Sequence, residues 1–588
     1  MAKLYIQVFV QQQEHECFSY HVSLESVITL FTYKYCNSKI LLYFVKSYST
    51  APTFSFGIDL LQFNFNWLNE TNLEPIVKSC ALPIILIGSN AVVAGLCSVS
   101  RKIVMLSQQT CEQENIAKLL GFKNACLMSP NEASMWTKFC EIDMISALKS
   151  VIQSIGCNFN NGSFSIPKDV ARFEHHLGQP VRLHNIYKVA QDLLKDKKIT
   201  SETVPRNLTS DSGAKVDQFP LTYKYAEGIE MTLSDVIIFP YFYILFHYVS
   251  LQILSEKMPL IINWYKQISL ENDGSLMKSI KFLHIPQIPC EPSATFLPSV
   301  EGYSLYKSNP KHYKCRNKNY TKQNDIDNVL KLLANVPLDI KKSVKRSLYT
   351  KNLDWNSLPF DALPEGGHLP EKRRVRKFQQ LENLAKAAIE IAKPGDHIID
   401  FCSGSGHLGI IIAFMLPQCH ISLLENKEES MNRAKSRVSK LGLNNVSFFQ
   451  CNLDFFKGEF QIGVSLHACG VATDLVMQHC IEREAKFICC PCCYGSVHQC
   501  HHLEYPRSKV YKEHLKLHEY LILGHGADQT HDAENAKTAQ GEICMDFIDK
   551  DRILYAQEFG YNVILQKLDP PTCTPKNNLL IGLKQMLE

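Results

Sequence analysis

The sequence predicts a multidomain protein that combines α/β and all-α parts and ends in a doubly wound, Rossmann-like α/β domain. Strand-like and helical segments alternate over the first hundred residues, residues 113–270 have helical length and period, and a glycine-rich loop marks the last third. A chain of 588 residues is long enough for about three domains of roughly 100–200 residues. We place the boundaries at 1–110, 111–272, 273–370 (a linker with a helical segment) and 371–588.

The composition is that of an ordinary globular protein, with 45% hydrophobic and 20% charged residues. Lys and Arg number 62 and Asp and Glu number 58, so the net charge of +4 does not by itself indicate nucleic-acid binding. The 22 cysteines include neighbours such as Cys489 and Cys490, which seldom bridge to each other, and we expect free thiols. We find neither a signal peptide nor a membrane-spanning run, so the sequence predicts a cytoplasmic protein with no membrane contact.

The first part of the chain predicts an α/β layer. Residues 3–10 and 39–45 have the pattern of strands, and residues 23–35 between them have the pattern of a helix. Residues 83–87 predict a further strand, which ends in a Gly-Ser-Asn turn. Alternating strands and helices of this kind favour a sheet with helices packed on it.

The second part predicts helices with few strands between them. The apolar run 237–254 contains Tyr, His and Pro, and we interpret it as a buried helix. Thr232-Leu233-Ser234-Asp235 before this run is a capping box, because the threonine hydroxyl can accept from a free helix amide while the aspartate reaches back.

This order of parts resembles the glutathione transferase family, in which a thioredoxin-like domain precedes an all-helical domain. Leu82-Pro83-Ile84 lies where the family carries a strand opened by a cis-proline. The residues that handle glutathione are not evident: Cys17 and Ser23 are the candidates for the activating residue, and Gly95-Leu96-Cys97-Ser98 lies where the family grips the γ-glutamyl end. The resemblance leaves two interpretations, glutathione chemistry or a degenerate docking module.

A proline-punctuated stretch separates this half from the last third. Prolines recur through residues 286–328 and again through 358–370, where they disfavour regular structure. Residues 326–349 between the two stretches have helical periodicity. We therefore expect a linker that contains one helical segment.

The last third predicts a doubly wound sheet with a ligand loop. Residues 379–391 predict a helix, 397–401 a buried strand and 410–415 a further helix. The loop before that last helix contains Gly404-x-Gly406-x-x-Gly409, whose glycines permit positive φ and close approach to a ligand. A strand, a glycine loop and a helix form the context of a nucleotide site, but the pattern alone is shared with dinucleotide enzymes.

Polar residues lie at the ends of three successive strands, and Asp400 among them favours S-adenosylmethionine (SAM). Asp400 lies before the loop, where class I methyltransferases carry an acid that meets the methionine part of SAM. Glu425 ends the next strand, where a carboxylate accepts both ribose hydroxyls, although a nicotinamide enzyme uses the same acid. Asn452 follows the third strand, at the position that usually reads the adenine edge. The alternative is that Asp400 and Glu425 are ordinary capping acids.

The remaining strands suggest an acceptor side. Residues 460–466 form a fourth strand that ends in His467, at the edge where the ligand crevice lies. A neutral imidazole there could take a proton from a hydroxyl or amine acceptor; alternatively it bonds a loop carbonyl. Asp474, beside Thr473, suits helix capping. Residues 561–565 and 578–583 predict a closing hairpin that gives the sheet an antiparallel edge, typical of class I methyltransferases.

The fifth strand ends in a cysteine-rich segment. Cys490 and Cys493 have the spacing of zinc ligands, with His498 and Cys500 nearby. The four thiols of the segment, interrupted by Pro491, cannot all face one ion, and a strand end that lines the acceptor pocket accounts for them equally well. We therefore expect no bound zinc, with Cys490 and Cys493 as the metal candidates, and nothing specific activates a cysteine for covalent catalysis.

From about residue 372 onward, the chain resembles a branch of the class I methyltransferases that includes RNA-modifying enzymes of the tRNA 2′-O-methylating kind. His467-Ala468-Cys469-Gly470-Val471-Ala472-Thr473-Asp474 and the later Cys489-Cys490 carry this resemblance. It implies SAM as the cofactor and RNA as a candidate acceptor. The basic run at 372–377 either meets phosphates or is a solvated helix face.

The leading hypothesis is a SAM-dependent methyltransferase whose acceptor is RNA or protein. Asp400, Gly404, Gly406, Glu425 and Asn452 hold SAM in this hypothesis, and His467 is the base. The glutathione transferase-like half is non-catalytic and docks a protein partner through its helical domain. The alternatives are a catalytically silent adaptor and a glutathione transferase.

Overall fold

The structure is a computed structural model and consists of two compact units, Met1–Pro310 and Lys311–Glu588. It describes residues 2–12, 18–52, 54–110, 114–128, 135–156, 162–181, 222–285, 292, 294–300, 305, 322–334, 353–367, 371–500, 502–530 and 537–584. The mixed α/β class predicted from the sequence is confirmed. The four predicted domain ranges stay predictions.

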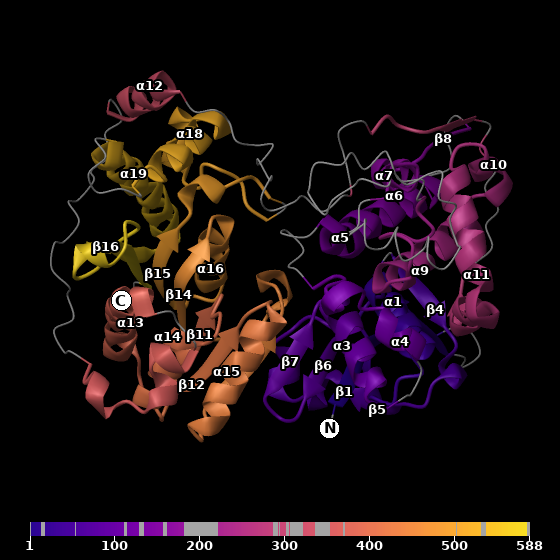
Figure 1. Ribbon diagram of the computed structural model, residues 1–588, viewed down its shortest axis with the longest axis horizontal. Coiled ribbons are helices and arrows are strands. Elements are labelled where there is room, and N and C mark those ends of the chain that lie inside the picture. Colours follow the sequence, from indigo (N-terminus) through magenta and orange to yellow (C-terminus); the bar gives the residue numbers. More distant parts are fainter. Residues whose placement is uncertain are drawn as a thin grey trace, which may run out of the picture. The chain divides into compact units, whose positions relative to one another are not determined.

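The first unit is built on a βαβ element followed by a hairpin (Figure 1). Strand β1 (Ala2–Gln12) pairs in parallel with β3 (Leu41–Ser47), and α1 (Leu24–Tyr35) connects the two strands. Strand β6 (Ile84–Ile87) pairs antiparallel with β1 and with β7 (Ala91–Ala94). These strands agree closely with the predicted segments, because short apolar runs bounded by turn residues mark them in the sequence.

Further strands extend this sheet, and helices cover it. The added strands are β2 (Phe18–Ser23), β4 (Ser55–Ile58), β5 (Asn66–Asn69) and β9 (Leu283–His284), and β8 (Ser163–Ser165) pairs separately with β10 (Ala294–Phe296). The other helices of the unit are α2 (Pro75–Lys78), α3 (Leu96–Gln108), α4 (Glu114–Lys118), α5 (Met135–Lys138), α6 (Met144–Gly156), α7 (Lys168–Leu177), α9 (Leu233–Tyr248), α10 (Leu251–Ser255) and α11 (Pro259–Ser279).

Helix α9 is the most apolar helix of the first unit, and its start is as predicted. Thr232 and Asp235 form the capping box, in which the Asp235 carboxylate accepts from the Thr232 amide at 2.9 Å. Asp235 is fully buried and also accepts from the indole of Trp264, and burial raises its pKa to about 6. The run predicted as one helix over 237–254 is two helices, because the backbone is extended at Val249.

The second unit contains a seven-stranded sheet in the order β16-β17-β15-β14-β11-β12-β13 (Figure 1). Its five parallel strands are β11 (His397–Phe401), β12 (His420–Leu424), β13 (Val446–Gln450), β14 (Ile462–Cys469) and β15 (Lys486–Cys492). Antiparallel β17 (Asn578–Lys584) pairs with β15 and with β16 (Tyr561–Lys567), as the closing hairpin predicts. The strand order reverses between β11 and β14, and open α/β sheets bind ligands at the carboxyl ends of such strands.

The helices of the second unit are α12 (Gln323–Ala334), α13 (Glu371–Ile391), α14 (His407–Met415), α15 (Glu428–Lys440), α16 (Val471–Glu482), α17 (Lys509–His514), α18 (Leu517–Ala527) and α19 (Lys537–Glu558). Helix α13 contacts β14 and β15 and begins earlier than predicted, so the basic run lies in its first turns. Helix α12 covers the first part of the predicted 326–349 segment, and residues beyond Ala334 lie outside the described ranges until 353. Among the described residues, no helix combines the length and apolar character that crossing a membrane requires.

Candidate functional site

The glycine loop between β11 and α14 lies at the switch point of the second sheet. Gly404 has a φ of 57°, and a Cβ added to it would meet nothing within 4 Å, so its backbone borders open space. Gly406 has a φ of 73° and begins α14, and a Cβ there would lie 2.9 Å from Leu423. Gly409 lies against Leu423 and Asp400 with no room for a Cβ. The glycines therefore divide their roles: Gly404 leaves room for a ligand, while Gly406 and Gly409 allow helix and sheet to pack closely.

Arg437 of α15 is hydrogen-bonded to the glycine loop. It is 2% exposed, and its guanidinium donates to the Ser405 carbonyl at 2.8 Å and to the carbonyls of Asp361 and Leu363 at 2.9 and 3.0 Å. Burial lowers its pKa to about 10, so it stays charged at neutral pH. Sequence reasoning missed this residue, since its spacing within α15 gives no sign that it reaches the loop.

Asp400 lies on β11 beneath the loop, as predicted. Its Oδ2 accepts from the Gly409 amide at 2.8 Å, and the side chain is buried. Burial raises the pKa of Asp400 to about 7, against the Gly409 hydrogen bond and the positive charge of Lys377. Burial in turn lowers the pKa of Lys377, which the charge of Asp400 opposes. Lys377 is half-buried, so a fully solvated helix face does not describe this residue of the basic run.

Glu425 follows β12 and turns toward the glycine loop. Its Oε2 accepts from the Gly404 amide at 2.8 Å, and its Oε1 accepts from the Lys427 amide at 2.9 Å. Each carboxylate oxygen has about two acceptor positions, so each keeps capacity for one further donor. Asn452, after β13, accepts through Oδ1 from Asn426 at 3.0 Å. The structure therefore brings Glu425 and Asn452 together through Asn426, a residue that the sequence analysis did not single out.

His467 lies in a bulge of β14. The pairing with β15 advances by three residues on β14, from Leu466 to Cys469, and by two on β15, and His467 takes a φ of 68° there. Its Nε2 lies 2.8 Å from Gln380 Oε1, and the Gln380 amide nitrogen donates to the Cys573 carbonyl at 2.8 Å. Because the Gln380 oxygen can only accept, His467 Nε2 carries the proton and Nδ1 is the unprotonated nitrogen.

The environment keeps the His467 imidazole neutral. Burial lowers its pKa to about 4, and the charge of Lys377 adds to this effect. The predicted alternative, a hydrogen bond to a loop carbonyl, differs from the structure, in which the partner is the side chain of Gln380.

A cavity of about 280 Å³ opens beside this histidine. Helix α13 and the loop before β17 supply its walls, and the lining residues are Arg373, Arg376, Lys377, Gln380, His467, Cys573, Thr574 and Pro575. Arg373 and Arg376 are exposed at its rim. The cavity is therefore basic at its mouth and has a neutral imidazole in its wall.

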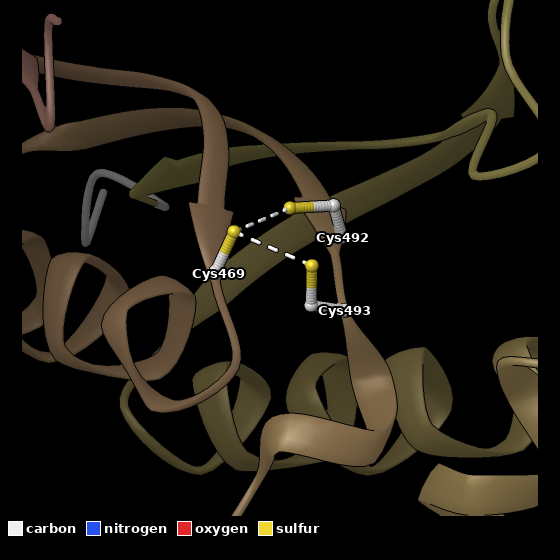
Figure 2. A group of neighbouring side chains, drawn as sticks. All are labelled: Cys469, Cys492 and Cys493. Atoms are coloured by element: carbon white, nitrogen blue, oxygen red, sulfur yellow. Dashed lines mark hydrogen bonds between the residues drawn. The ribbon is translucent and has the colours of Figure 1, made fainter. Parts of the chain in front are cut away.

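The cysteine-rich segment divides in the structure (Figure 2). Cys490 is buried, and its thiol donates to the Lys576 carbonyl at 3.6 Å. Cys493 instead lies with Cys469 and Cys492. The Cys469 sulfur is 3.4 Å from the Cys493 sulfur and 3.2 Å from the Cys492 sulfur. The expected pairing of Cys490 with Cys493 is therefore not the one that the structure shows. Hydrogen bonds from Cys492 and Cys493 lower the pKa of Cys469.

Asp474 has a role other than the predicted helix cap. Gly470 precedes α16 as its cap residue, and Asp474 instead forms a buried ion pair with Arg552 of α19, with an Nη2–Oδ2 distance of 2.8 Å. Arg552 also pairs with Asp549 at 2.9 Å, and Tyr505 donates to Asp474 at 2.8 Å. This network joins α16 to α19.

The candidate glutathione residues of the first unit have other partners. Ser23 caps α1 and accepts from the Ser26 amide at 3.2 Å, while Cys17 lies outside the described residues. At the start of α3, the Cys97 amide donates to the buried Glu141 carboxylate at 3.3 Å, and burial raises the pKa of the Cys97 thiol. A protein carboxylate thus lies at the helix end where the resemblance places the γ-glutamyl group.

A family model described as "Methyltransferase domain" matches residues 373–500, which lie within the second unit. The SAH-bound Podospora anserina methyltransferase PaMTH1 is similar over 39% of this chain and 89% of its own, at 11% identity and a TM-score of 0.26. At that TM-score the likeness supports no statement about activity. A Parabacteroides distasonis protein named ribosomal RNA small subunit methyltransferase G is 32% identical over 136 residues, which are 22% of this chain and 53% of that protein.

Several relatives match nearly the whole chain. The Drosophila melanogaster glutathione S-transferase C-terminal domain-containing protein homolog is 37% identical, with 99% of each chain covered. The human glutathione S-transferase C-terminal domain-containing protein is 33% identical, with 98% of this chain and 97% of its own covered. The chain belongs to this family of glutathione S-transferase C-terminal domain-containing proteins.

Proposed function

We propose that the second unit is a SAM-dependent methyltransferase and that the glutathione transferase-like half is a non-catalytic docking module. The observation that supports the methyltransferase proposal most directly is the open space at Gly404. The Glu425 carboxylate borders this space at the switch point of the sheet. A side chain at Gly404 would fill the space that a bound nucleoside needs.

The residues present fit SAM. Glu425 keeps one acceptor position on each oxygen for the two ribose hydroxyls, and Asp400 offers a carboxylate for the ammonium of the methionine part. Asn452 and Asn426, which are hydrogen-bonded to each other, would bind the adenine edge. SAM supplies a sulfonium methyl group, and the chain's task is to position an acceptor in line with it.

His467 is suited to act as the base in this function. Its unprotonated Nδ1 can take a proton from an acceptor hydroxyl or amine, because Gln380 holds the proton on Nε2. With a pKa of about 4, the imidazole is in its neutral form throughout the physiological range. Gln380 is a positioning residue that acts through His467.

RNA is the acceptor class that we propose. Arg373, Arg376 and Lys377 line the cavity beside His467, and guanidinium groups bind phosphate in a bidentate manner. The relative named ribosomal RNA small subunit methyltransferase G supports the same class. A protein acceptor is the alternative, and methylation assays with labelled SAM on RNA and protein fractions distinguish the two.

The proposed docking role of the first half rests on the N-terminal end of α3, where a protein carboxylate, that of Glu141, already accepts from a helix amide. Glu141 already accepts from the Cys97 amide, and burial keeps that thiol protonated. We infer that glutathione does not bind there and that the helical part is free to dock a protein partner. Retention of the purified chain on immobilised glutathione would contradict this part of the proposal and favour a glutathione transferase.

Calorimetric titration of SAM into the purified chain tests the methyltransferase proposal. We expect binding by the wild type and at least a tenfold loss in Glu425→Ala and in Gly404→Arg, because one removes the ribose acceptor and the other fills the open space. Glu390→Ala, an exposed carboxylate of α13, serves as the control and should bind as the wild type does. Unchanged binding in both variants would show that the pocket is wrongly assigned, and no binding by the wild type would favour the silent adaptor.

A further inference from the structure

The bulge in β14 brings three cysteine thiols together at the carboxyl edge of the second sheet. Cys469 ends β14 opposite Cys492, which ends β15, and their sulfurs are 3.2 Å apart. Without the extra residue of the bulge, the side-chain alternation of β14 would turn Cys469 to the other face. The bulge thus creates the pair.

The third thiol joins because the backbone turns sharply after β15. Consecutive residues of a strand point to opposite faces, which would separate Cys493 from Cys492. Cys493 instead has a φ of 49°, in the left-handed region, and its sulfur lies 3.4 Å from that of Cys469 (Figure 2). This turn brings two neighbouring thiols of the segment together with Cys469, while Cys489 and Cys490 do not join the group.

We propose that Cys469, Cys492 and Cys493 bind one Zn²⁺ ion as three thiolates and leave a fourth coordination position open. The three sulfurs lie within 4.8 Å of one another. Zinc–sulfur bonds of about 2.3 Å in a tetrahedron place sulfurs about 3.8 Å apart, so the two pairs that share Cys469 need to separate by only about half an ångström. Thiolate ligands select zinc over magnesium or calcium.

The surroundings suit an anionic trithiolate site. Three zinc-bound thiolates and the ion carry a net charge of −1. The positive charges of Lys377 and Lys576 act on Cys492, and that of Lys427 acts on Cys469, where the charge of Asp528 opposes it. Zinc displaces the thiol protons to the buffer, and no oxidant or reductant is consumed. Among the described residues, no fourth His, Cys, Asp or Glu ligand atom joins the group, so water or an acceptor atom completes the tetrahedron.

A disulfide is the competing use of these thiols. A disulfide would join Cys469 to either Cys492 or Cys493 and leave the remaining thiol unbonded, whereas one ion would bind all three sulfurs. The segment's other candidates, His498 and Cys500, do not lie with the three thiols among the described residues.

Zinc content of the full-length protein tests the proposal. The protein is reduced, incubated with Zn²⁺, separated from free metal and measured by mass spectrometry of the metal. We expect about one ion per chain in the wild type, a loss of at least tenfold in Cys469→Ser and Cys493→Ser, and no loss in Cys500→Ser, the matched control. Retention in the first two variants, or loss in the control, would overturn the assignment.

A second measurement on the wild type alone guards against variants that fail to fold. Cd²⁺ alone is titrated into the reduced protein, and the sulfur-to-cadmium absorption should saturate at one ion with the intensity of three thiolates. No such absorption, together with a Cys469–Cys492 disulfide found in the air-exposed protein by peptide mapping, would replace the zinc site by a redox pair. SAM titration is a separate readout: Cys469→Ser is expected to keep SAM binding, so failure of the zinc site and of the methyltransferase proposal can be told apart.

Discussion

At the scale of single residues, the site depends on groups whose ionisation is set by burial. Asp400 is buried beside Lys377, and its pKa rises to about 7, whereas that of His467 falls to about 4. Burial disfavours the charged form in both cases, which raises the pKa of an acid and lowers the pKa of a base. The two groups therefore respond to pH in separate ranges.

The first prediction concerns the pH dependence of SAM affinity. The ionised form of Asp400 attracts the SAM ammonium, and this form is lost as the pH falls through about 7. Relative to Asp400→Asn, wild-type affinity should fall by up to tenfold per pH unit below 7 and stay constant above it, since changes in the ligand cancel in the ratio. Titrations from about pH 5.5 to about pH 8 measure this ratio, and parallel curves for the two proteins would refute the prediction.

A second prediction at this scale concerns Gln380, which is 7% exposed and bonds both His467 and the Cys573 carbonyl. Gln380→Leu leaves a donor and an acceptor without partners and should lower the stability of the second unit by about 1–3 kcal/mol. Gln379→Leu, on the neighbouring position of α13, is the control and should change stability by less than about 0.5 kcal/mol. Thermal unfolding curves of both variants provide the comparison; equal curves would mean that the chain of hydrogen bonds contributes little.

At the scale of elements, a buried ion network joins α16 to α19. Arg552 is 1% exposed and pairs with Asp474 and Asp549, both also buried. A buried charge that loses its partner is costly, although an intact pair adds little over apolar packing. The network therefore makes the contact between these helices specific.

The element-scale prediction follows from this network. Arg552→Met leaves two buried carboxylates unpaired and should destabilise the second unit by about 3–5 kcal/mol. Adding Asp474→Asn to this variant should recover part of the loss, because one of the charges is removed. Arg433→Met, which breaks an exposed pair within α15, is the comparison and should cost less than about 0.5 kcal/mol. Chemical unfolding measured at the same pH ranks the variants, and equal costs for Arg552→Met and Arg433→Met would contradict the argument.

At the scale of the whole molecule, the chain consists of two compact units with separate cores. The proposed SAM site lies entirely in the second unit, at the carboxyl ends of β11, β12 and β13. A ligand stabilises only the unit that binds it.

Scanning calorimetry with and without SAM tests this statement. SAM at a hundred times its Kd adds about 2.7 kcal/mol to the stability of the binding unit, so one transition should move to higher temperature and the other should stay. In the Glu425→Ala variant, neither transition should move when SAM is added. Movement of both transitions by the same amount would mean that the two units unfold as one.

The sequence by itself determined the mixed α/β class, the succession of parallel strands along the last third of the chain, and the positions of Asp400 and Glu425 beside the glycine loop. Short apolar runs, turn residues and the spacing of Asp400, Gly404 and Glu425 are local signals, and local signals are readable along the chain. The same holds for the capping box at Thr232, which lies within four residues.

Only the tertiary structure decided which distant residues meet. Arg437 reaches the Ser405 carbonyl, Gln380 orients His467, and Lys377 lies near Asp400 because helices separated in sequence pack over one sheet edge. The thiol of Cys469 meets Cys492 through a bulge, and a bulge depends on the pairing of two strands and not on the composition of either one. Contacts of this kind depend on packing and register, which a single sequence does not display.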